Sequence, residues 1–236
     1  MHPTGSVENM LSALEYAFRT RYTSKDVNLT GIVFARPTNR FARREILPHI
    51  NYWHVRSGRA TDLFFPGYAD KYHDLSYRYE DFKNATEVDG QKWYFSDHAF
   101  ADVVQEIESR SSWRYSGGTE LIIVNARFGA RTYANGKIRE GASLDLSSAI
   151  AIDLESAAKD KAFRDVTELI EGLFEFCNNL NTAEDNPCWA FSDRHGFRIV
   201  KSSLKEWLID WLPKALRPEA KKAFYFAARD ISPKLT

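Results

Sequence analysis

Arginine is concentrated in one short stretch of the chain, residues 30–45. Arg36 follows a run of apolar residues. Arg40, Arg43 and Arg44 then crowd the first turns of the helix expected next. A helix N-terminus carries partial positive charge, so arginine is unfavourable there unless an anion or an acidic group offsets it. This placement predicts a binding site for a phosphate or carboxylate group, with Arg36, Arg40 and Arg43 as its ligand-binding residues.

Acidic residues stand where two other strands are expected to end. Asp97 comes shortly after residues 91–95. Asp153 and Glu155 lie where residues 148–153 give way to a helix. In open α/β sheets, ligands bind outside the carboxyl ends of the strands. If these strands are parallel and adjacent, the three acids share one crevice with the arginines and are the candidate catalytic residues. The alternative is that they supply the negative charge that a helix N-terminus favours.

Tyr68 follows another expected strand, residues 61–65, and its ring could stack on a nucleotide base. Arginines for phosphate, a ring for a base and carboxylates for hydroxyl groups together suit a nucleotide-like ligand. Neither usual phosphate-binding fingerprint, GxGxxG or GxxxxGK followed by Ser or Thr, occurs in the chain. The alternative assigns these residues to caps, turns and surface ion pairs, and the sequence leaves both interpretations open.

Other catalytic and metal-binding patterns are missing. The six histidines show neither HxH nor HExxH spacing, so no metal site is expected. Ser96 lacks the glycines of a GxSxG nucleophile turn and is better explained as a helix N-cap. The apolar run 120–125 lacks the lysine that a metal-dependent nuclease would carry on such a strand. The sequence therefore identifies no cofactor and leaves open whether any reaction is catalysed.

The composition is that of an ordinary globular protein with a balanced charge. The chain has 236 residues, with 32 basic and 32 acidic side chains, and this neutrality argues against a nucleic-acid-binding protein. No cationic region followed by an apolar one opens the chain, and no apolar run is long enough to span a membrane, so a cytoplasmic protein is expected. Cys177 and Cys188 could pair, but we expect two reduced packing residues.

Hydrophobic periodicity predicts the elements that position these residues. The expected fold is a single α/β domain, residues 1–236, with a mixed, partly parallel sheet, helices on both faces and several β-hairpins. Helices are expected at 7–22, 39–57 with a kink or a restart at Pro48, 97–116 and 154–180, and a further helix is expected to open with the capping box at 203–206. Strands are expected at 32–35, 61–65, 85–88, 91–95, 120–126, 148–153, 189–191 and 197–200, the first two as a parallel β-α-β unit.

Two segments stand outside this regular pattern. Residues 67–92 contain many tyrosines and form an expected excursion from the core. Residues 214–236 form a C-terminal element, within which 219–230 are undecided between helix and strand. Tight hairpin turns are expected at Asp89-Gly90 and Asn135-Gly136, and a longer turn at 193–196.

One segment carries a recognisable pattern, whose residues are Tyr52, His54, Arg56, Ser57 and Gly58, followed by Asp62, Phe64, Gly67 and Tyr68. The pattern resembles a segment of uncharacterised bacterial α/β proteins, some of them encoded near phage-defence genes. It covers less than a tenth of the chain. The resemblance implies a bacterial, defence-related context and no particular activity. By itself, the position of His54 and Arg56 in the last turn of a helix indicates that they complement the helix dipole.

These observations support two main hypotheses. The first is a cytosolic bacterial protein that binds a small anionic, nucleotide-like ligand at the carboxyl edge of its sheet, with or without turnover. The second is a protein-interaction subunit, either a homo-oligomer or part of a larger defence assembly, with no catalytic site. Aromatic residues make up 14% of the chain and favour the second, with a docking surface formed by Tyr68, Tyr72, Tyr77 and Tyr79. Nucleic-acid binding is the least expected function.

Overall fold

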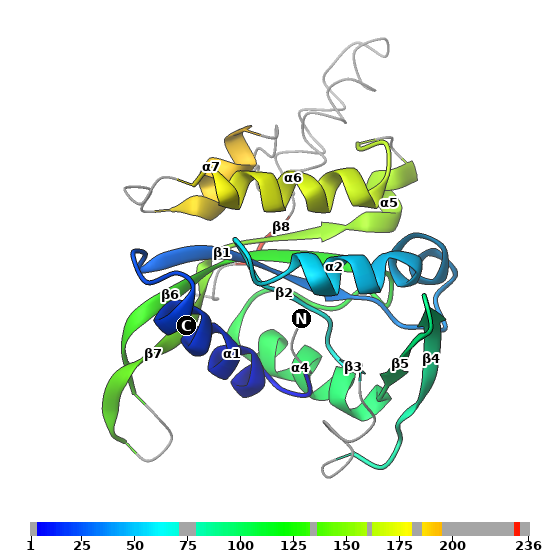
Figure 1. The fold of residues 1–236 in the computed structure, drawn as a ribbon, viewed down its shortest axis with the longest axis horizontal. Helices are drawn as coiled ribbons and strands as arrows, with labels where there is room; N and C mark the ends of the chain where they lie inside the picture. Colours follow the sequence, from blue (N-terminus) through cyan, green and yellow to red (C-terminus); the bar gives the residue numbers. More distant parts are fainter. Residues whose placement is uncertain are drawn as a thin grey trace.

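The computed structural model describes residues 4–70, 79–132, 136–159, 162–180, 186–194 and 229–231. Its main sheet has five strands in the order β2-β1-β6-β7-β8 (Figure 1). Their bounds are β1 Val27–Phe34, β2 Leu63–Phe64, β6 Glu120–Thr132, β7 Ile138–Asp153 and β8 Arg229–Asp230. β1 and β2 are parallel, whereas every other neighbouring pair is antiparallel. The predicted α/β fold with a mixed, partly parallel sheet is thus confirmed.

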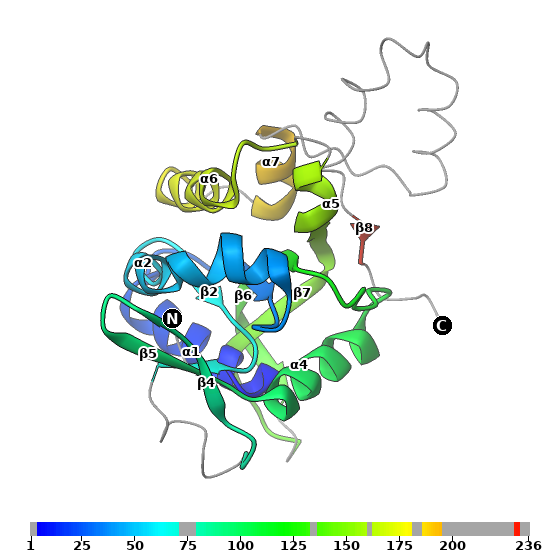
Figure 2. The ribbon, with the colours of Figure 1, turned by 90° about the vertical axis from the view of Figure 1, so that its right-hand side faces the viewer.

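Helices cover both faces of this sheet (Figure 2). α1, Val7–Thr20, and α4, Asp97–Arg110, lie on one face. α5, Leu154–Lys159, α6, Val166–Asn178, and α7, Pro187–Arg194, lie on the other. One continuous hydrophobic core joins these layers, because the apolar stripe of each helix packs on a sheet whose central strands are buried on both sides.

The helical segment after β1 contains the expected irregularity at Pro48. A π-helix, η1, spans Ala42–Ile46, and a 3₁₀ turn, η2, spans Leu47–His49. The α-helix α2, Ile50–Arg56, then begins two residues after the proline. Proline cannot donate an intrahelical hydrogen bond and its ring clashes with the preceding turn, so the ladder is rearranged around it. The restart predicted as one alternative at Pro48 is confirmed.

Residues 67–92 contribute a second, antiparallel sheet, in the order β3-β5-β4. Its strands are β3 Tyr68–Ala69, β4 Lys83–Val88 and β5 Gln91–Phe95. Asp89 and Gly90 connect β4 to β5 with φ values of 50° and 77°, as a tight hairpin turn requires. The hairpin expected from this Asp-Gly pair is confirmed.

Several predicted elements are wrong in extent or type, among them the strand expected at 148–153, which begins at Ile138 as β7. The helix expected at 154–180 is two helices, because Asp165 caps a new one by accepting a hydrogen bond from the Glu168 backbone N–H. α4 ends at Arg110, well before Gly117. Residues 189–191, expected as a strand, lie inside α7, which opens with Pro187. At Asp165 a local cap, and at Pro187 a first-turn proline, outweighs the apolar pattern.

Both cysteines are buried and unpaired, as expected. Burial raises the pKa of the Cys177 thiol to about 12 and also raises that of Cys188. The described residues include no helix whose length and apolar composition would suit a bilayer crossing. The elements expected at 197–200 and 203–206 lie outside the described residues, as does the undecided segment 219–230 except for its last two residues, which form β8.

Candidate functional site

Several predicted site residues lie together at one edge of the main sheet, where the carboxyl ends of three strands meet. β1, β2 and β7 run in the same direction, because β1 pairs parallel with β2 and two antiparallel pairings separate β1 from β7. Their carboxyl ends therefore meet at one edge, where Arg36, Asn39 and Glu155 follow the strands. Asp97, at the start of α4, contacts Arg36 there. Asn125 and Arg127, in contrast, lie within β6 and not beyond a strand end.

Arg36 already has a counter-charge from the chain itself. Its Nη1 lies 2.6 Å from Oδ1 of Asp97, and its guanidinium stacks over the Phe100 ring at 4.5 Å. Lys83 donates from Nζ to the other oxygen of Asp97 at 2.5 Å. The Arg36 side chain is 33% exposed and that of Asp97 is 42% exposed, so the pair is still accessible to solvent. Asp97 thus holds two cations and is not a free base in this arrangement.

Glu155 and Asp153 also have structural partners. Oε1 of Glu155 accepts hydrogen bonds from Nδ2 of Asn39 at 2.7 Å and from the Thr119 backbone N–H at 3.1 Å. Asn39 in turn caps the helical run after β1 by accepting from the Ala42 backbone N–H. Asp153 accepts from the backbone and side chain of Ser156. Asp153 therefore caps the start of α5, whereas Glu155, in the first turn of α5, holds Asn39 and the backbone before β6. Both have the structural role that the sequence left open as the alternative.

Tyr115 belongs to this edge although sequence analysis did not identify it. Its hydroxyl donates to the Gly118 carbonyl at 2.7 Å, and its ring lies 5.3 Å from that of Phe100. Burial raises the Tyr115 pKa to about 12, against the opposing effect of the nearby Arg36 guanidinium. In the sequence, the feature that could have identified Tyr115 is its position just before Gly117-Gly118, the turn that precedes β6.

Two of the predicted arginines remain without a counter-charge. Arg40 and Arg43 are exposed, and neither side chain makes an ion pair or hydrogen bond within the described part of the chain. Arg44, next to them, pairs with Glu45. Arg40 and Arg43 are therefore the predicted ligand-binding residues whose charge is still available.

The tyrosines proposed to contact a ligand or a partner are buried. Tyr68 is fully buried, and its hydroxyl donates to the Ala35 carbonyl at 2.8 Å. Tyr79 is 6% exposed and donates to the Gly5 carbonyl and to Asp102. Tyr68 cannot stack on a ligand, and neither ring can form a docking surface, so these two predictions are wrong. Tyr72 and Tyr77 lie outside the described residues.

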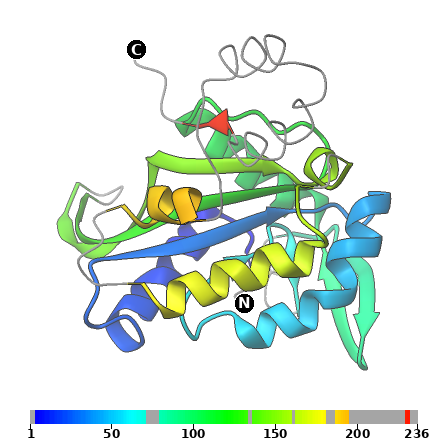
Figure 3. The same ribbon diagram turned by 90° about the horizontal axis from the view of Figure 1, so that it is seen from above.

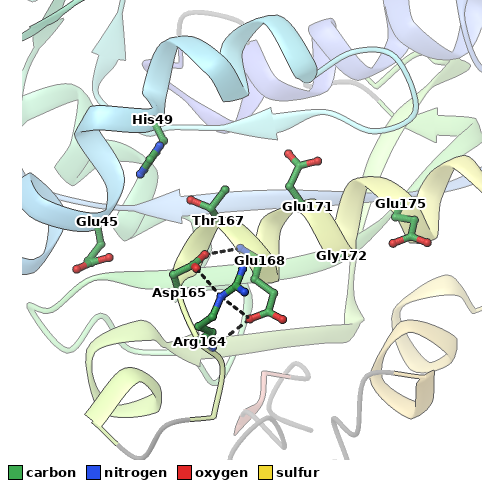
Figure 4. Close-up of a pocket in the computed structure, with 9 residues that line it drawn as sticks. All are labelled: Glu45, His49, Arg164, Asp165, Thr167, Glu168, Glu171, Gly172 and Glu175. Atoms are coloured by element: carbon green, nitrogen blue, oxygen red, sulfur yellow. Dashed lines mark hydrogen bonds and ion pairs between the residues drawn. The ribbon is translucent and has the colours of Figure 1, made fainter.

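A groove of about 750 Å³ runs between α6 and the helical segment η1–η2 (Figure 4). Five carboxylates line it, together with one arginine and one histidine. The lining residues are Glu45, His49, Arg164, Asp165, Thr167, Glu168, Glu171, Gly172 and Glu175. Arg164 turns back onto Asp165 and Glu168. We refer to this hollow as the acidic groove.

A second groove, of about 490 Å³, separates α2 from the β4–β5 turn. Its lining residues are Asn51, Tyr52, His54, Val55, Asp70, Asp89 and Gln91. Tyr52 is 49% exposed and Val55 is 68% exposed. Partial burial and the nearby Glu171 carboxylate raise the pKa of Tyr52, and Glu171 also lines the acidic groove. Tyr52, Val55 and the two grooves are called the α2 surface below.

The segment from Tyr52 to Tyr68 is mainly a structural unit. Arg56 pairs with Glu171 across the helices at 3.3 Å, and Ser57 accepts from the Leu63 backbone N–H. Gly58 adopts φ 92° and accepts from Arg21 through its carbonyl oxygen. Tyr52 reaches the surface, as does part of His54, whose side chain is 33% exposed.

Among the described residues, no group of three or more His, Cys, Asp or Glu side chains could hold a metal ion. No protein-family model, curated protein sequence or solved structure matches this chain.

Proposed function

We propose that this protein is an interaction subunit that binds another polypeptide through its α2 surface. The observation that carries the proposal is the pair of exposed apolar side chains, Tyr52 and Val55, between two grooves. They are three residues apart on α2 and so lie on one side of the helix. Contiguous exposed apolar surface rimmed by polar groups marks interaction sites, and tyrosine is a frequent binding hot spot.

The α2 surface takes the place of the docking surface proposed from the tyrosines of residues 67–92. The interaction belongs in the cytosol of a bacterium, in the defence-related context that the resemblance of residues 52–68 implies. Because the resembling segment includes Tyr52 and builds α2 and its connection to β2, it supports the helix that presents the surface.

We expect Tyr52→Ala to weaken partner binding by about thirtyfold, which corresponds to roughly 2 kcal/mol for a hot-spot tyrosine. A photo-crosslinking amino acid at position 55, in cells that make the protein at its natural level, should join it to one polypeptide that mass spectrometry identifies. Tyr52→Ala should abolish that product.

The matched control is position 16. Tyr16 lies on α1, is 60% exposed and carries the same side chain as Tyr52. A crosslinker placed there should give no specific product, and Tyr16→Ala should leave the product formed from position 55 unchanged. Equal products from positions 16 and 55, or no product from position 55, would refute the proposal.

The second candidate function is binding of a small anionic, nucleotide-like ligand, and Arg40 and Arg43 favour it. Both side chains are exposed beside the carboxyl edge of the sheet and have no counter-charge in the described part of the chain. A bound phosphate would supply the anion that arginine needs near a helix N-terminus. Tyr115, whose ring is partly exposed, replaces Tyr68 as the side chain available beside such a ligand.

Arg40→Ala should weaken phosphate binding about tenfold or more, because it removes one charge-assisted hydrogen-bonding group. Calorimetric titration with ATP and with inorganic pyrophosphate measures this. Arg44→Ala is the control, since Arg44 lies on the same helical segment but is already paired with Glu45. Both variants should unfold near the wild-type temperature, and an affinity unaffected by Arg40→Ala would exclude this function.

A further inference from the structure

The β6–β7 hairpin extends beyond the rest of the main sheet. The β1 pairing ends at Arg127, and the Phe128 backbone N–H still donates to the Asp26 carbonyl, so residues 129–132 of β6 pair only with residues 138–141 of β7. Gly129, Ala130 and residues 136–140 are all exposed. Because successive side chains of a strand point to opposite faces, Ile138 lies on the face opposite to Arg131, which is 17% exposed and pairs with Glu8 of α1. The tip projects into solvent as an arm.

The two faces of the arm differ in chemistry. Ile138 is 70% exposed, the most exposed large apolar side chain in the described part of the chain. Its neighbours Lys137 and Arg139 are exposed and lie toward the opposite face. Arg131, directly across from Arg139, is only 17% exposed and pairs with Glu8, so Lys137 and Arg139 are the exposed cations of that face. Glu140 is the acid of residues 136–140 and shares the face of Ile138.

The α2 surface has the complementary properties. Its acidic groove carries five carboxylates, against three arginines that pair with them, Arg44, Arg56 and Arg164. Glu175 is exposed and has no ion pair within the described residues. Tyr52 and Val55 line the second groove and offer apolar contact there. Basic and apolar side chains on the arm therefore match acidic and apolar side chains on the α2 surface.

The arm and the α2 surface lie at different ends of the molecule. In Figures 1 and 3 the arm extends on the left, whereas η1 and α2 reach toward the right. One copy of the chain cannot bring them together without rearranging the sheet, but two copies can. Pairing of two α2 surfaces would instead place like charges face to face, which costs free energy.

We propose that the α2 surface of one copy binds the β6–β7 arm of a second copy, in a head-to-tail contact. This rests on the proposed function, because it names the polypeptide that the α2 surface binds. Such a contact uses different surfaces on the two partners, so each bound copy leaves one arm and one α2 surface free. Association then continues into longer assemblies, driven by apolar burial and by charge pairs that salt screens.

Light scattering during size-exclusion chromatography tests this with two complementary variants. The groove variant carries Val55→Asp and Glu175→Lys, and the arm variant carries Ile138→Asp and Arg139→Glu. All four positions are exposed, and thermal unfolding checks that each variant is folded. If a double variant does not fold, the single substitution Glu175→Lys or Arg139→Glu is used in its place. Tyr16→Ser is the control for loss of an exposed apolar side chain.

We expect the wild-type mass to rise with concentration above the 27.1 kDa of one chain and to fall back on adding salt. Each variant alone should stay at the monomer mass. An equal mixture should form a species of twice that mass and nothing larger, because only one intact arm and one intact α2 surface remain per pair. Tyr16→Ser should behave as wild type.

Three results would overturn the head-to-tail contact: a wild-type protein that stays monomeric, a variant that still assembles, or a mixture that forms no dimer. The crosslinker at position 55 separates this failure from failure of the proposed function. A product joined to a different protein, without self-association, retains the α2 surface as a binding site and rejects the arm as its occupant. A product that joins position 55 to residues 136–140 supports both.

Discussion

Asp62→Ala is expected to lower the free energy of unfolding by roughly 3–5 kcal/mol, the usual effect of removing one partner of a buried ion pair. The Asp62 side chain is 2% exposed and lies 3.2 Å from Nη2 of Arg21. Its other oxygen accepts a hydrogen bond from the Tyr22 hydroxyl at 3.0 Å. The substitution leaves the Arg21 charge and the Tyr22 hydroxyl without this partner at the point where the end of α1 meets β2. Urea unfolding, followed by fluorescence, measures the change.

The control for this substitution is Glu106→Ala. It removes an ion pair with Arg110 that lies on the outside of α4, where the two side chains are 30% and 56% exposed. Exposed pairs of this kind contribute less than about 1 kcal/mol. Arg21→Ala combined with Asp62→Ala should cost less than the sum of the two single substitutions, because each removes the same interaction. A loss for Asp62→Ala no larger than that for Glu106→Ala would show that this pair does not hold α1 against β2.

Gly67→Ala should destabilise the protein by about 2–5 kcal/mol, from backbone strain of about 1–2 kcal/mol and overpacking of about 1–3 kcal/mol. Gly67 has φ 80°, in the left-handed region that disfavours a Cβ atom. A Cβ there would also lie 2.8 Å from the Ser96 carbonyl oxygen and 2.9 Å from the Phe95 ring. Backbone hydrogen bonds with Thr4 and Ser96 hold Gly67 in place, so little relief by movement is expected.

Gly90→Ala separates the two contributions. Gly90 has φ 77°, nearly the same as Gly67, but a Cβ at this position meets no atom within 4 Å. It should therefore show only the strain of about 1–2 kcal/mol. The difference in the free energy of unfolding between the two variants, measured by urea titration, reports the tight packing where β3 leaves the main core. Equal losses at the two glycines would contradict that packing argument.

Much of the fold could be predicted because its signals are local. Ser6 and Ser96 cap α1 and α4 through hydrogen bonds to backbone groups three residues away. Pro48 and the Asp89-Gly90 pair act on their own turns. The elements that were missed had competing local signals: the apolar stripe runs through residues 154–180, but Asp165 begins a new helix within it. Periodicity cannot detect such an interruption when the interruption keeps the apolar spacing.

The sequence indicated where charged residues gather, but not whether their side chains are already paired with one another. Arg36 contacts Asp97 and Asn39 contacts Glu155 near the carboxyl edge of the main sheet, although these pairs are 61 and 116 residues apart in sequence. Asp97, however, follows β5 of the second sheet, so its place beside Arg36 comes from the packing of the two sheets and not from a shared strand order. The Arg36–Asp97 ion pair neutralises the arginine charge that the prediction assigned to binding a ligand. The sequence shows which hydrogen-bond donors and acceptors lie near the edge of the sheet. Only the distances in the structure show that these groups form hydrogen bonds and ion pairs with one another.

The amino-acid sequence by itself therefore determined the helices, the turns, most of the strands and the edge at which charged residues gather, since caps, prolines, glycines and apolar spacing act over a few residues. The tertiary structure alone decided which groups remain available for binding. Tyr52 and Tyr68 are the same residue type in one short segment, yet α2 carries Tyr52 outward and the second sheet buries Tyr68 completely. Exposure depends on what packs against a side chain from elsewhere in the chain, and that information is absent from any local stretch of sequence.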